Sequence, residues 1–507
     1  MSDIFLKKLH IKNYKCFKDH SIELQTPNGA EGSGLNIFIG ENGKGKTSVL
    51  EAIDFLTQSQ YASENRMKID YFNKYDEEIC VSAETDEFVC NMDFPYKGTF
   101  ECKGIEFIAK NRTRKSPGKL LSSTFQVTSK FTLKTDNYLN QDGTDSGKEV
   151  PPLLQNFSNG SIKDGELNIF YFDNNRNWQI STGTYKTTFE RICDDLNWKF
   201  VKNLSDEMEV QEDGESEEKK VDIIYNMITD KIDDSYFNNV LEIAQKGVGE
   251  KLAKGLKDFF NNKDYDKLRI DILKFLSPFS SAFFSVREDK SLQQITTKEL
   301  GSGIEMILTL LLLKSISEQS KGSIIYLIDE PELHLHPKAQ DKLIDLLVKE
   351  SKDKQIIVST HSPYIFKNTI HRGVGLKLFK EDKGKIVVED ARDTSWGVLP
   401  WSPSWGEINY RIYNVPSVEF HNELYGYLQE KESLYKEKDV ESFLNSKSIS
   451  KSKQWIRERD GTIEAPYDVT LCTYVRNKIH HPDNTNNSGF SEKELEDSIV
   501  ILLSVIT

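Results

Sequence analysis

The sequence predicts an α/β fold built around a parallel sheet, and two segments carry this prediction. The first, LNIFIGENGKGKTSVLEAIDFL at 35–56, runs from an apolar strand through a glycine-rich loop into apolar residues at helical spacing. The second, SIIYLIDEPELHLHP at 323–337, is a short apolar strand followed by two carboxylates. A strand-loop-helix unit combined with acidic residues at the end of another strand is typical of nucleotide-binding α/β domains.

The composition is that of a globular protein with room for two or more domains. The chain has 507 residues, of which 37% are hydrophobic and 29% charged. A net charge of −14 disfavours non-specific coating of nucleic acid, although a local basic surface could hold a strand. The apolar runs are too short to cross a bilayer and the N-terminus lacks a signal-peptide layout, so we expect a cytoplasmic protein without a membrane partner. Six cysteines without a C-x-x-C pair argue against a zinc site.

The predicted elements follow the chain in order. Residues 4–17 alternate apolar and basic side chains like a partly exposed strand, and residues 35–39 form a strand that enters the loop. Past the loop, Val49, Leu50, Ile53 and Leu56 predict a helix. Regular structure returns near residue 303, where the predicted elements are an apolar helix from Gly303, a buried strand at 323–328, a helix opened by Pro337 and a strand at 355–360.

Four parts are predicted from this order. The signal weakens from about residue 60 to residue 290, and the acidic run EDGESEEKK within it reads as a solvated loop. Helices are expected at about 417–433 and 491–506. The predicted parts are an N-terminal lobe at 1–200, a helical or short coiled-coil insertion at 201–290, a C-terminal lobe at 291–394 and a mainly helical C-terminal domain at 395–507.

The glycine-rich loop matches the pattern G-x-x-x-x-G-K-[ST] and predicts a phosphate cradle. Its glycines let backbone N–H groups close around phosphates, Lys46 reaches the β and γ phosphates, and Thr47 supplies a hydroxyl to Mg²⁺. ATP and Mg²⁺ are therefore the expected cofactors. The candidate nucleotide-binding residues here are Gly40, Asn42, Gly43, Gly45, Lys46, Thr47 and Ser48.

Two carboxylates end the buried strand at 323–328, at the edge where ligands of parallel sheets bind. We expect Asp329 to hold Mg²⁺ through water, and Glu330 to polarise the water that attacks the γ-phosphate. The alternative is a buried strand with a solvated acidic end, which the presence of the loop disfavours.

Further motifs resemble those of ABC-type ATPases. The segment LGSGIEMILTLLL, in which Ser302 and Gly303 open a helix, is similar to the ABC signature, and His361 in STHSP stands where the family has its switch histidine. The resemblance implies that Ser302 and Gly303 bind the γ-phosphate held by a second subunit, so ATP would join two heads in a homodimer or larger oligomer. The alternative for this pair is a plain helix N-cap.

Within this class the chain resembles the SMC, RecF and OLD branch. The segments LHIKNYKCF, GENGKGKTSVLEAI and DEPELHLHP carry the resemblance, which covers residues 1–60 and 295–365 best. The signature departs from the usual Ser-Gly-Gly-Gln, and the interval is too short for the long coiled coil of SMC proteins. His334 and His336 are expected to pack beside the strand rather than bind metal. The glutamine loop stays open among Gln58, Gln60 and Gln179.

The C-terminal domain contains TYVRNKIHHPDN at 473–484. Arg476, Asn477 and His481 resemble the R-N-x-x-x-H motif of HEPN ribonucleases, as in the anticodon nucleases PrrC and RloC. That resemblance implies metal-free RNA cleavage, with histidine as acid or base and arginine steadying the phosphate charge. The alternative is a basic helix end stopped by Pro482. A TOPRIM nuclease, as in OLD proteins, is not expected, because VVEDARD at 387–393 lacks the required glycine and no D-x-D follows it.

Three functions follow from these motifs. The first is an ATP-driven switch and scaffold that controls a nuclease partner in trans, since short-armed heads resemble the ATPase subunits of phage-defence systems such as PARIS and Septu. The second is a HEPN-type ribonuclease acting in cis on RNA or tRNA when the head signals. The third, a RecF-like repair ATPase, leaves the extra C-terminal domain without a purpose. Nucleic acid is a possible ligand in each case.

Overall fold

A computed structural model describes most of the head and nearly all of the C-terminal domain. The described residues are 4–56, 63, 66–92, 98–112, 125–134, 137–140, 144–149, 167–172, 245–261, 268–271, 283–287, 294–296, 307, 311, 314, 323–333, 335–392, 397–459 and 462–507. They form two compact units. One holds residues up to 38, 45–360 and 371–375, and the other holds 39–44, 361–370 and 376–507.

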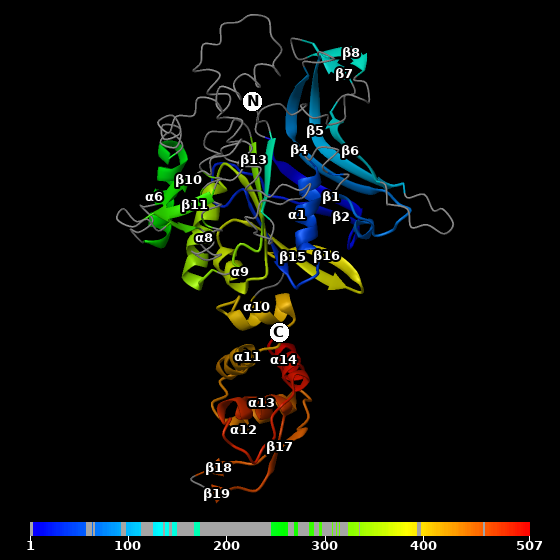
Figure 1. Cartoon of the computed structure of the whole chain (residues 1–507). Coiled ribbons are helices and arrows are strands. Elements are labelled where there is room, and N and C mark those ends of the chain that lie inside the picture. The colour runs from blue at the N-terminus through cyan, green and yellow to red at the C-terminus, as the bar shows by residue number, and fades with distance from the viewer. Residues whose placement is uncertain are drawn as a thin grey trace, which may run out of the picture. The chain divides into compact units, whose positions relative to one another are not determined.

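A seven-stranded sheet lies in the first unit, with the order β2-β1-β4-β5-β7-β8 and β6 paired to β5 (Figure 1). Every pairing in it is antiparallel. Its apolar face is filled by aromatic side chains, including Phe55 of α1 stacked on Phe107. The strands are β1 Leu6–Tyr14, β2 Phe17–Glu23, β4 Ile79–Met92, β5 Gly98–Asn111, β6 Phe125–Leu133, β7 Asn137–Leu139 and β8 Asp145–Glu149.

The N-terminal strand differs from its prediction, because residues 4–17 form a hairpin rather than one strand. Asn13 and Lys15 adopt left-handed backbone conformations, with φ of 56° and 48°. The Asn13 side-chain amide donates to the carbonyl oxygens of Lys74 and Glu77, at 2.9 and 2.8 Å. These bonds fix the turn, so β2 starts at Phe17 and folds back on β1.

The second sheet carries the candidate site. It has six strands in the order β16-β15-β3-β14-β13-β9. β13 is parallel to both β14 and β9, which confirms the predicted parallel core, and β15 pairs with β16 in antiparallel fashion. The strands are β3 Leu35–Gly40, β9 Leu167–Phe172, β13 Ser323–Asp329, β14 Gln355–Thr360, β15 Gly375–Asp382 and β16 Lys385–Asp390.

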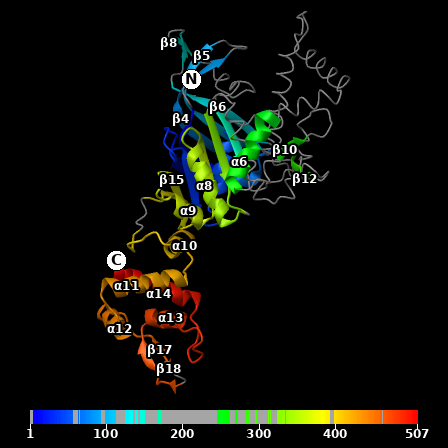
Figure 2. The same cartoon turned by 90° about the vertical axis from the view of Figure 1, so that its left-hand side faces the viewer.

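Helices cover both faces of the parallel strands. α1 (Lys46–Phe55) contacts β13, β9 and β14 on one face, and α8 (Pro337–Glu350) lies on the opposite face (Figure 1, Figure 2). Both helices were predicted. The remaining elements of this unit are η1 Ile69–Tyr71, η3 Gln245–Gly249, α6 Glu250–Phe260, β10 Leu268–Asp271, β11 Phe283–Arg287 and β12 Gln294–Thr296. The predicted helix from Gly303 falls outside the described residues except at positions 307, 311 and 314.

The C-terminal part of the second unit is mainly helical, as predicted. Its helices are α9 Pro363–Thr369, α10 Trp405–Tyr413, α11 Val418–Lys431, α12 Glu437–Ser446, α13 Leu471–His480 and α14 Glu492–Ile506. Two short hairpins complete it, and they pair β17 Lys453–Trp455 with β20 Tyr467–Val469 and β18 Glu458–Arg459 with β19 Thr462–Ile463. In the described part of the chain, no helix is both long and apolar enough to span a bilayer.

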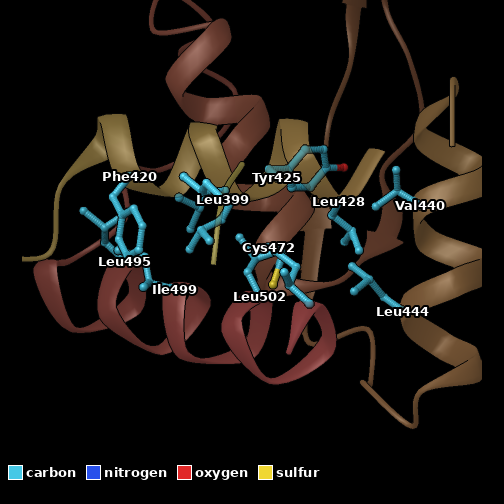
Figure 3. Packing of buried hydrophobic residues seen from close by; sticks show 13 residues of the cluster. Leu399, Phe420, Tyr425, Leu428, Val440, Leu444, Cys472, Leu495, Ile499 and Leu502 are labelled. Carbon is cyan, nitrogen blue, oxygen red and sulfur yellow. The ribbon is translucent and has the colours of Figure 1, made fainter. Parts of the chain in front are cut away.

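One apolar core holds α11 to α14 together (Figure 3). Phe420, Leu424 and Leu428 lie one turn apart on α11 and belong to one buried cluster with Ile499 and Leu502 of α14. Each of these side chains is fully removed from solvent. Burial of this kind is worth about 1.5–3 kcal/mol for each large side chain, so the four helices form a stable domain core.

Candidate nucleotide-binding site

The glycine-rich loop joins β3 to α1 and depends on its glycines. All six residues of β3 are buried, and the chain leaves it at Gly40 with φ of 149°. A Cβ at Gly40 would lie 2.2 Å from the Phe379 carbonyl oxygen. Gly45 has φ of 90°, and a Cβ there would lie 2.6 Å from Cys16 Sγ. No larger residue fits either position without moving its neighbours, so the tight loop requires glycine.

The two lysines of the loop have different surroundings. Lys44 Nζ forms salt bridges with Glu381 Oε2 at 2.6 Å and with Glu41 Oε2 at 3.6 Å. Lys46 opens α1 and is only 4% exposed. A lysine at the first position of a helix puts its charge beside free backbone N–H groups, which suits a phosphate. Lys46 is thus the phosphate-binding candidate, whereas Lys44 is held by carboxylates.

Asp329 lies at the end of β13 and faces the start of α1. Its Oδ1 accepts a hydrogen bond from Thr47 Oγ1 at 3.0 Å and another from Ser359 Oγ. Ser359 is its register partner on the parallel strand β14, which is why the two side chains meet. The side chain is 1% exposed. The structure therefore brings together Thr47 and Asp329, the two residues predicted to hold Mg²⁺.

The second oxygen of Asp329 has a different environment. Oδ2 is buried and has no hydrogen-bond partner among the described residues. A buried carboxylate oxygen in this state is costly unless a cation or donor completes it. Carboxylate and hydroxyl oxygens are the ligands that Mg²⁺ prefers. The donor set of Asp329 and Thr47 therefore fits Mg²⁺.

Burial also shifts the titration of this carboxyl. Removal from water raises the pKa of Asp329, while the hydrogen bonds from Ser359 and Thr47 and the charge of Lys46 act in the opposite direction. A raised pKa means that folding disfavours the ionised form of Asp329 relative to the unfolded chain. Ionisation of Asp329 therefore raises the free energy of the folded protein, and a bound cation would offset this increase.

Glu330 follows directly and has an unusual backbone. Its φ is 47°, in the left-handed region that non-glycine residues rarely adopt. Its N–H donates to the Ser359 carbonyl oxygen at 2.9 Å, and its own carbonyl oxygen accepts from Leu333 N at 3.2 Å. Glu330 is partly exposed at the carboxyl end of β13. Such an outlier is typical of functional sites.

Other predicted residues are placed as follows. His361 comes directly after β14 and before Ser362, whose hydroxyl caps α9. His336 is exposed and caps α8, with its Nδ1 accepting from Lys338 N at 3.3 Å, so it does not pack beside the strand as expected. The predicted residues outside the described part of the chain are Ser302, Gly303, His334, Gln58, Gln60 and Gln179.

Two polar residues of the site were missed by sequence reasoning. Ser359 shares the Asp329 carboxylate, and Thr360 Oγ1 donates to Glu332 Oε1 at 2.6 Å. Both lie at the end of the apolar strand QIIVST. Two hydroxyl residues ending a buried parallel strand are the signal that could have identified them, because such ends converge at the ligand edge.

The C-terminal motif has a different geometry. Arg476 Nη1 donates to Asn477 Oδ1 at 3.1 Å, and its guanidinium lies 6.0 Å from the Tyr425 ring. Asn477 is 2% exposed and its amide donates to Glu437 Oε2 at 3.0 Å. His481 is the exposed C-cap of α13, and no hydrogen bond joins it to Arg476 in this fully described helix. A side-chain hydrogen bond joins Arg476 to Asn477, whereas His481 is linked to Asn477 through its backbone N–H, which donates to the Asn477 carbonyl oxygen at 2.8 Å.

His480 and Glu423 complete the description of this region. Burial lowers the pKa of His480, and the positive charges of Arg476 and His481 lower it further. Glu423 accepts a hydrogen bond from Ser404, the N-cap of α10. It therefore serves the helix start at α10.

The loop between β3 and α1, with Asp329 at a parallel strand end, defines a P-loop ATPase head. Residues 5–366 match the family described as AAA ATPase domain, so the chain belongs to that family. This match confirms an α/β head of the ABC type. It ends before α10 and the helices that follow.

Relatives at low identity are found among bacterial proteins. An OLD nuclease of Thermus scotoductus is 24% identical over 78% of this chain and 66% of its own length. The retron Vc95 probable ATPase of Vibrio cholerae is 23% identical over 71% of each chain. The DNA replication and repair protein RecF of Streptococcus gordonii is 24% identical over 76% of this chain and 100% of RecF. The chain thus spans slightly less than two thirds of the OLD nuclease.

Solved structures include an SMC head bound to the C-winged helix domain of ScpA. The match covers 76% of this chain and 98% of the SMC head chain, at 14% identity and a TM-score of 0.41.

Proposed function

We propose that the protein binds ATP·Mg²⁺ and hydrolyses it slowly, as a switch. The observation that carries this is Asp329, whose one oxygen binds Thr47 while the other is buried without a partner among the described residues. Mg²⁺ at this point would neutralise phosphate charge. Lys46 binds the β and γ phosphates, and Glu330 accepts the proton of the attacking water.

The two loop lysines offer a matched test of nucleotide binding. Lys46→Ala removes the buried charge at the helix start and should abolish ATP binding in calorimetry. Lys44→Ala breaks only the salt bridges to Glu381 and Glu41, so it should bind ATP like the parent. If Lys46→Ala binds ATP as tightly as the parent, Lys46 is not the phosphate-binding residue.

We further propose that two heads share each nucleotide, with Ser302 and Gly303 of one head contacting the γ-phosphate of the other. The ABC-type class of the head supports this. Glu330→Gln with ATP should lock the head contact, and Ser302→Arg should prevent it. If Ser302→Arg hydrolyses ATP like the parent, the shared site is wrong.

The switch is proposed to control a nuclease in trans, as in a phage-defence system. Relatives named as an OLD nuclease and a retron ATPase support an ATPase of defence or repair type. Within the second unit, α9 begins two residues after His361 and contacts the C-terminal domain: Tyr364 stacks on Trp405 at 5.7 Å. A change at His361 therefore has a physical route through α9 to α10.

The test of this control is a difference in partner affinity. ATP influences a partner only if the two nucleotide states bind it unequally. The nuclease that co-purifies with the tagged protein should bind the ADP form and the trapped Glu330→Gln ATP form with different affinities. Equal affinities would exclude control of the partner by nucleotide, and the protein would then act only as a scaffold.

A ribonuclease acting in cis is the second candidate, and one observation favours it. Arg476 and His480 are four residues apart in α13, so an arginine and a histidine share one face of the helix. Replacing Arg476, His480 or His481 by alanine should then abolish toxicity or defence while ATP hydrolysis persists. If all three variants protect cells like the parent, nuclease chemistry lies on another chain. A RecF-like repair role, the third candidate, is supported by the full-length match to RecF.

A further inference from the structure

Glu332 lies two residues after Glu330, and the switch described above gives it no task. It is the second glutamate of DEPE, in the turn that follows β13. Its Oε1 accepts a hydrogen bond from Thr360 Oγ1 at 2.6 Å, a length typical of a hydroxyl donating to a carboxylate. Thr360 is the last residue of β14, is fully buried and precedes His361. One side-chain bond thus joins the turn that carries Glu330 to the strand end that carries His361.

The turn between residues 330 and 335 needs such a tie. Glu330 has the left-handed φ of 47°, a conformation that persists only where surrounding contacts impose it. Two backbone bonds act on it, from its N–H to Ser359 O at 2.9 Å and from Leu333 N to its carbonyl oxygen at 3.2 Å. Leu335 N donates to the Glu332 carbonyl oxygen at 3.0 Å. The Glu332–Thr360 bond is the side-chain contact that closes this turn onto β14.

We propose that Glu332 is a positioning residue for ATP hydrolysis. By holding Thr360, it keeps the Glu330 carboxylate and the backbone before His361 in one arrangement at the carboxyl edge of the sheet. The proposal rests on the proposed role of Glu330 as the group that activates water. In this role the Oε1 of Glu332 acts as the acceptor of the Thr360 hydroxyl.

Four single variants separate positioning from chemistry. Glu332→Gln keeps an acceptor oxygen for the Thr360 hydroxyl and should hydrolyse ATP within about threefold of the parent. Glu332→Ala removes the acceptor and should lower kcat about tenfold or more, with unchanged ATP affinity. Thr360→Val removes the donor at nearly constant volume and should match Glu332→Ala. Thr360→Ser restores the hydroxyl and should recover the parental rate.

Steady-state hydrolysis and calorimetric ATP affinity are measured for each variant of the full chain, with thermal unfolding as a check on folding. The double variant Glu332→Ala/Thr360→Val should be no slower than either single variant, because both remove the same bond. If Glu332→Ala does not fold, the comparison of Thr360→Val with Thr360→Ser decides alone.

Three results would overturn the proposal. They are a parental kcat in Thr360→Val, additive losses in the double variant, and a loss in Glu332→Gln as large as that in Glu330→Gln. The parent and Glu330→Gln are measured alongside. If these two hydrolyse ATP equally, the role of Glu330 fails. If only Glu330→Gln loses hydrolysis and Thr360→Val does not, the role of Glu332 alone fails.

Discussion

The end of β13 and the end of α13 both carry motif residues, yet their polar atoms are in opposite states. At β13, Asp329 shares one oxygen between two hydroxyl donors and keeps the other buried without a partner in the described part of the chain. At α13, the Asn477 side chain accepts from Arg476 and donates to Glu437. The end of β13 keeps an acceptor oxygen available for a ligand, whereas the polar groups of Asn477 at the end of α13 are already paired within the protein.

This difference teaches how to weigh two sequence motifs of similar length. A buried group that lacks a partner raises the free energy of the empty protein, so it persists where a ligand restores the balance. A buried group with all its partners stabilises the fold without a ligand. The β13 end therefore supports a binding function more directly than the α13 end does.

The largest expected effect is a loss of ATP hydrolysis after substitution at the end of β13. Glu330→Gln removes the carboxylate that activates water and should lower ATP hydrolysis by about 10²–10⁴-fold, while ATP still binds. Phosphate release and calorimetry measure the two quantities. Hydrolysis at the parental rate would show that Glu330 is not the base.

The next effect concerns acid stability of the helical domain. Burial lowers the pKa of His421 to about 4, while a hydrogen bond with Asn422 acts in the opposite direction and the charge of His480 lowers the pKa further. The unfolded chain binds a proton near pH 6.5 that the folded domain rejects until about pH 4, so stability falls as pH drops through this window. The loss amounts to about 3 kcal/mol at full extent.

Hydrogen exchange of α11 and α14 between pH 7 and pH 4.5 measures this loss. His421 Nε2 lies 2.9 Å from Ser498 Oγ, so the matched variant His421→Gln keeps a polar partner for Ser498 but does not titrate. It should show a flatter dependence on pH. An identical slope in both proteins would exclude His421 as the cause.

A smaller effect tests the structural character of the helix end. Asn477→Ala removes the buried amide that donates to the partly exposed Glu437 carboxylate and accepts from the Arg476 guanidinium, and it should cost about 1–3 kcal/mol of stability. ATP hydrolysis should be unchanged. Chemical unfolding followed through Trp455, which packs in the small core beside α13, measures the cost. Unchanged stability would mean that the Asn477 side chain is free for another task.

The smallest effect concerns the contact between α9 and α10. Trp405 stacks on Tyr364 at 5.7 Å, and Lys367 Nζ lies 4.7 Å from its ring centre. Trp405→Ala should cost about 0.5–1.5 kcal/mol beyond lost burial, and it should reduce any effect of nucleotide on the exchange of α10 amides. Trp401→Ala is the control, since Trp401 packs on Tyr427 instead. Equal responses in both variants would contradict a route through Trp405.

The sequence predicted the parallel core and the loop because their signals are local. Buried strands such as 323–328 are continuous apolar runs, and the glycine pattern of 40–47 has few backbone solutions. The hairpin at Asn13 was missed because the bonds that turn it come from residues 74 and 77, far along the chain. Ser359 and Thr360 were missed for the same reason, since only strand register brings them to Asp329 and Glu332.

Whether Asp329 holds Mg²⁺ beside bound ATP can be tested by measuring how Mg²⁺ changes ATP affinity in the parent and in Asp329→Asn. In the parent, Mg²⁺ should strengthen ATP binding, because Asp329 and Thr47 complete its ligand shell. The variant should lose most of that gain. It should also unfold at a higher temperature near pH 7, because burial raises the pKa of Asp329 and the amide removes the cost of its charge. If Mg²⁺ strengthens ATP binding equally in both proteins, Asp329 does not hold Mg²⁺.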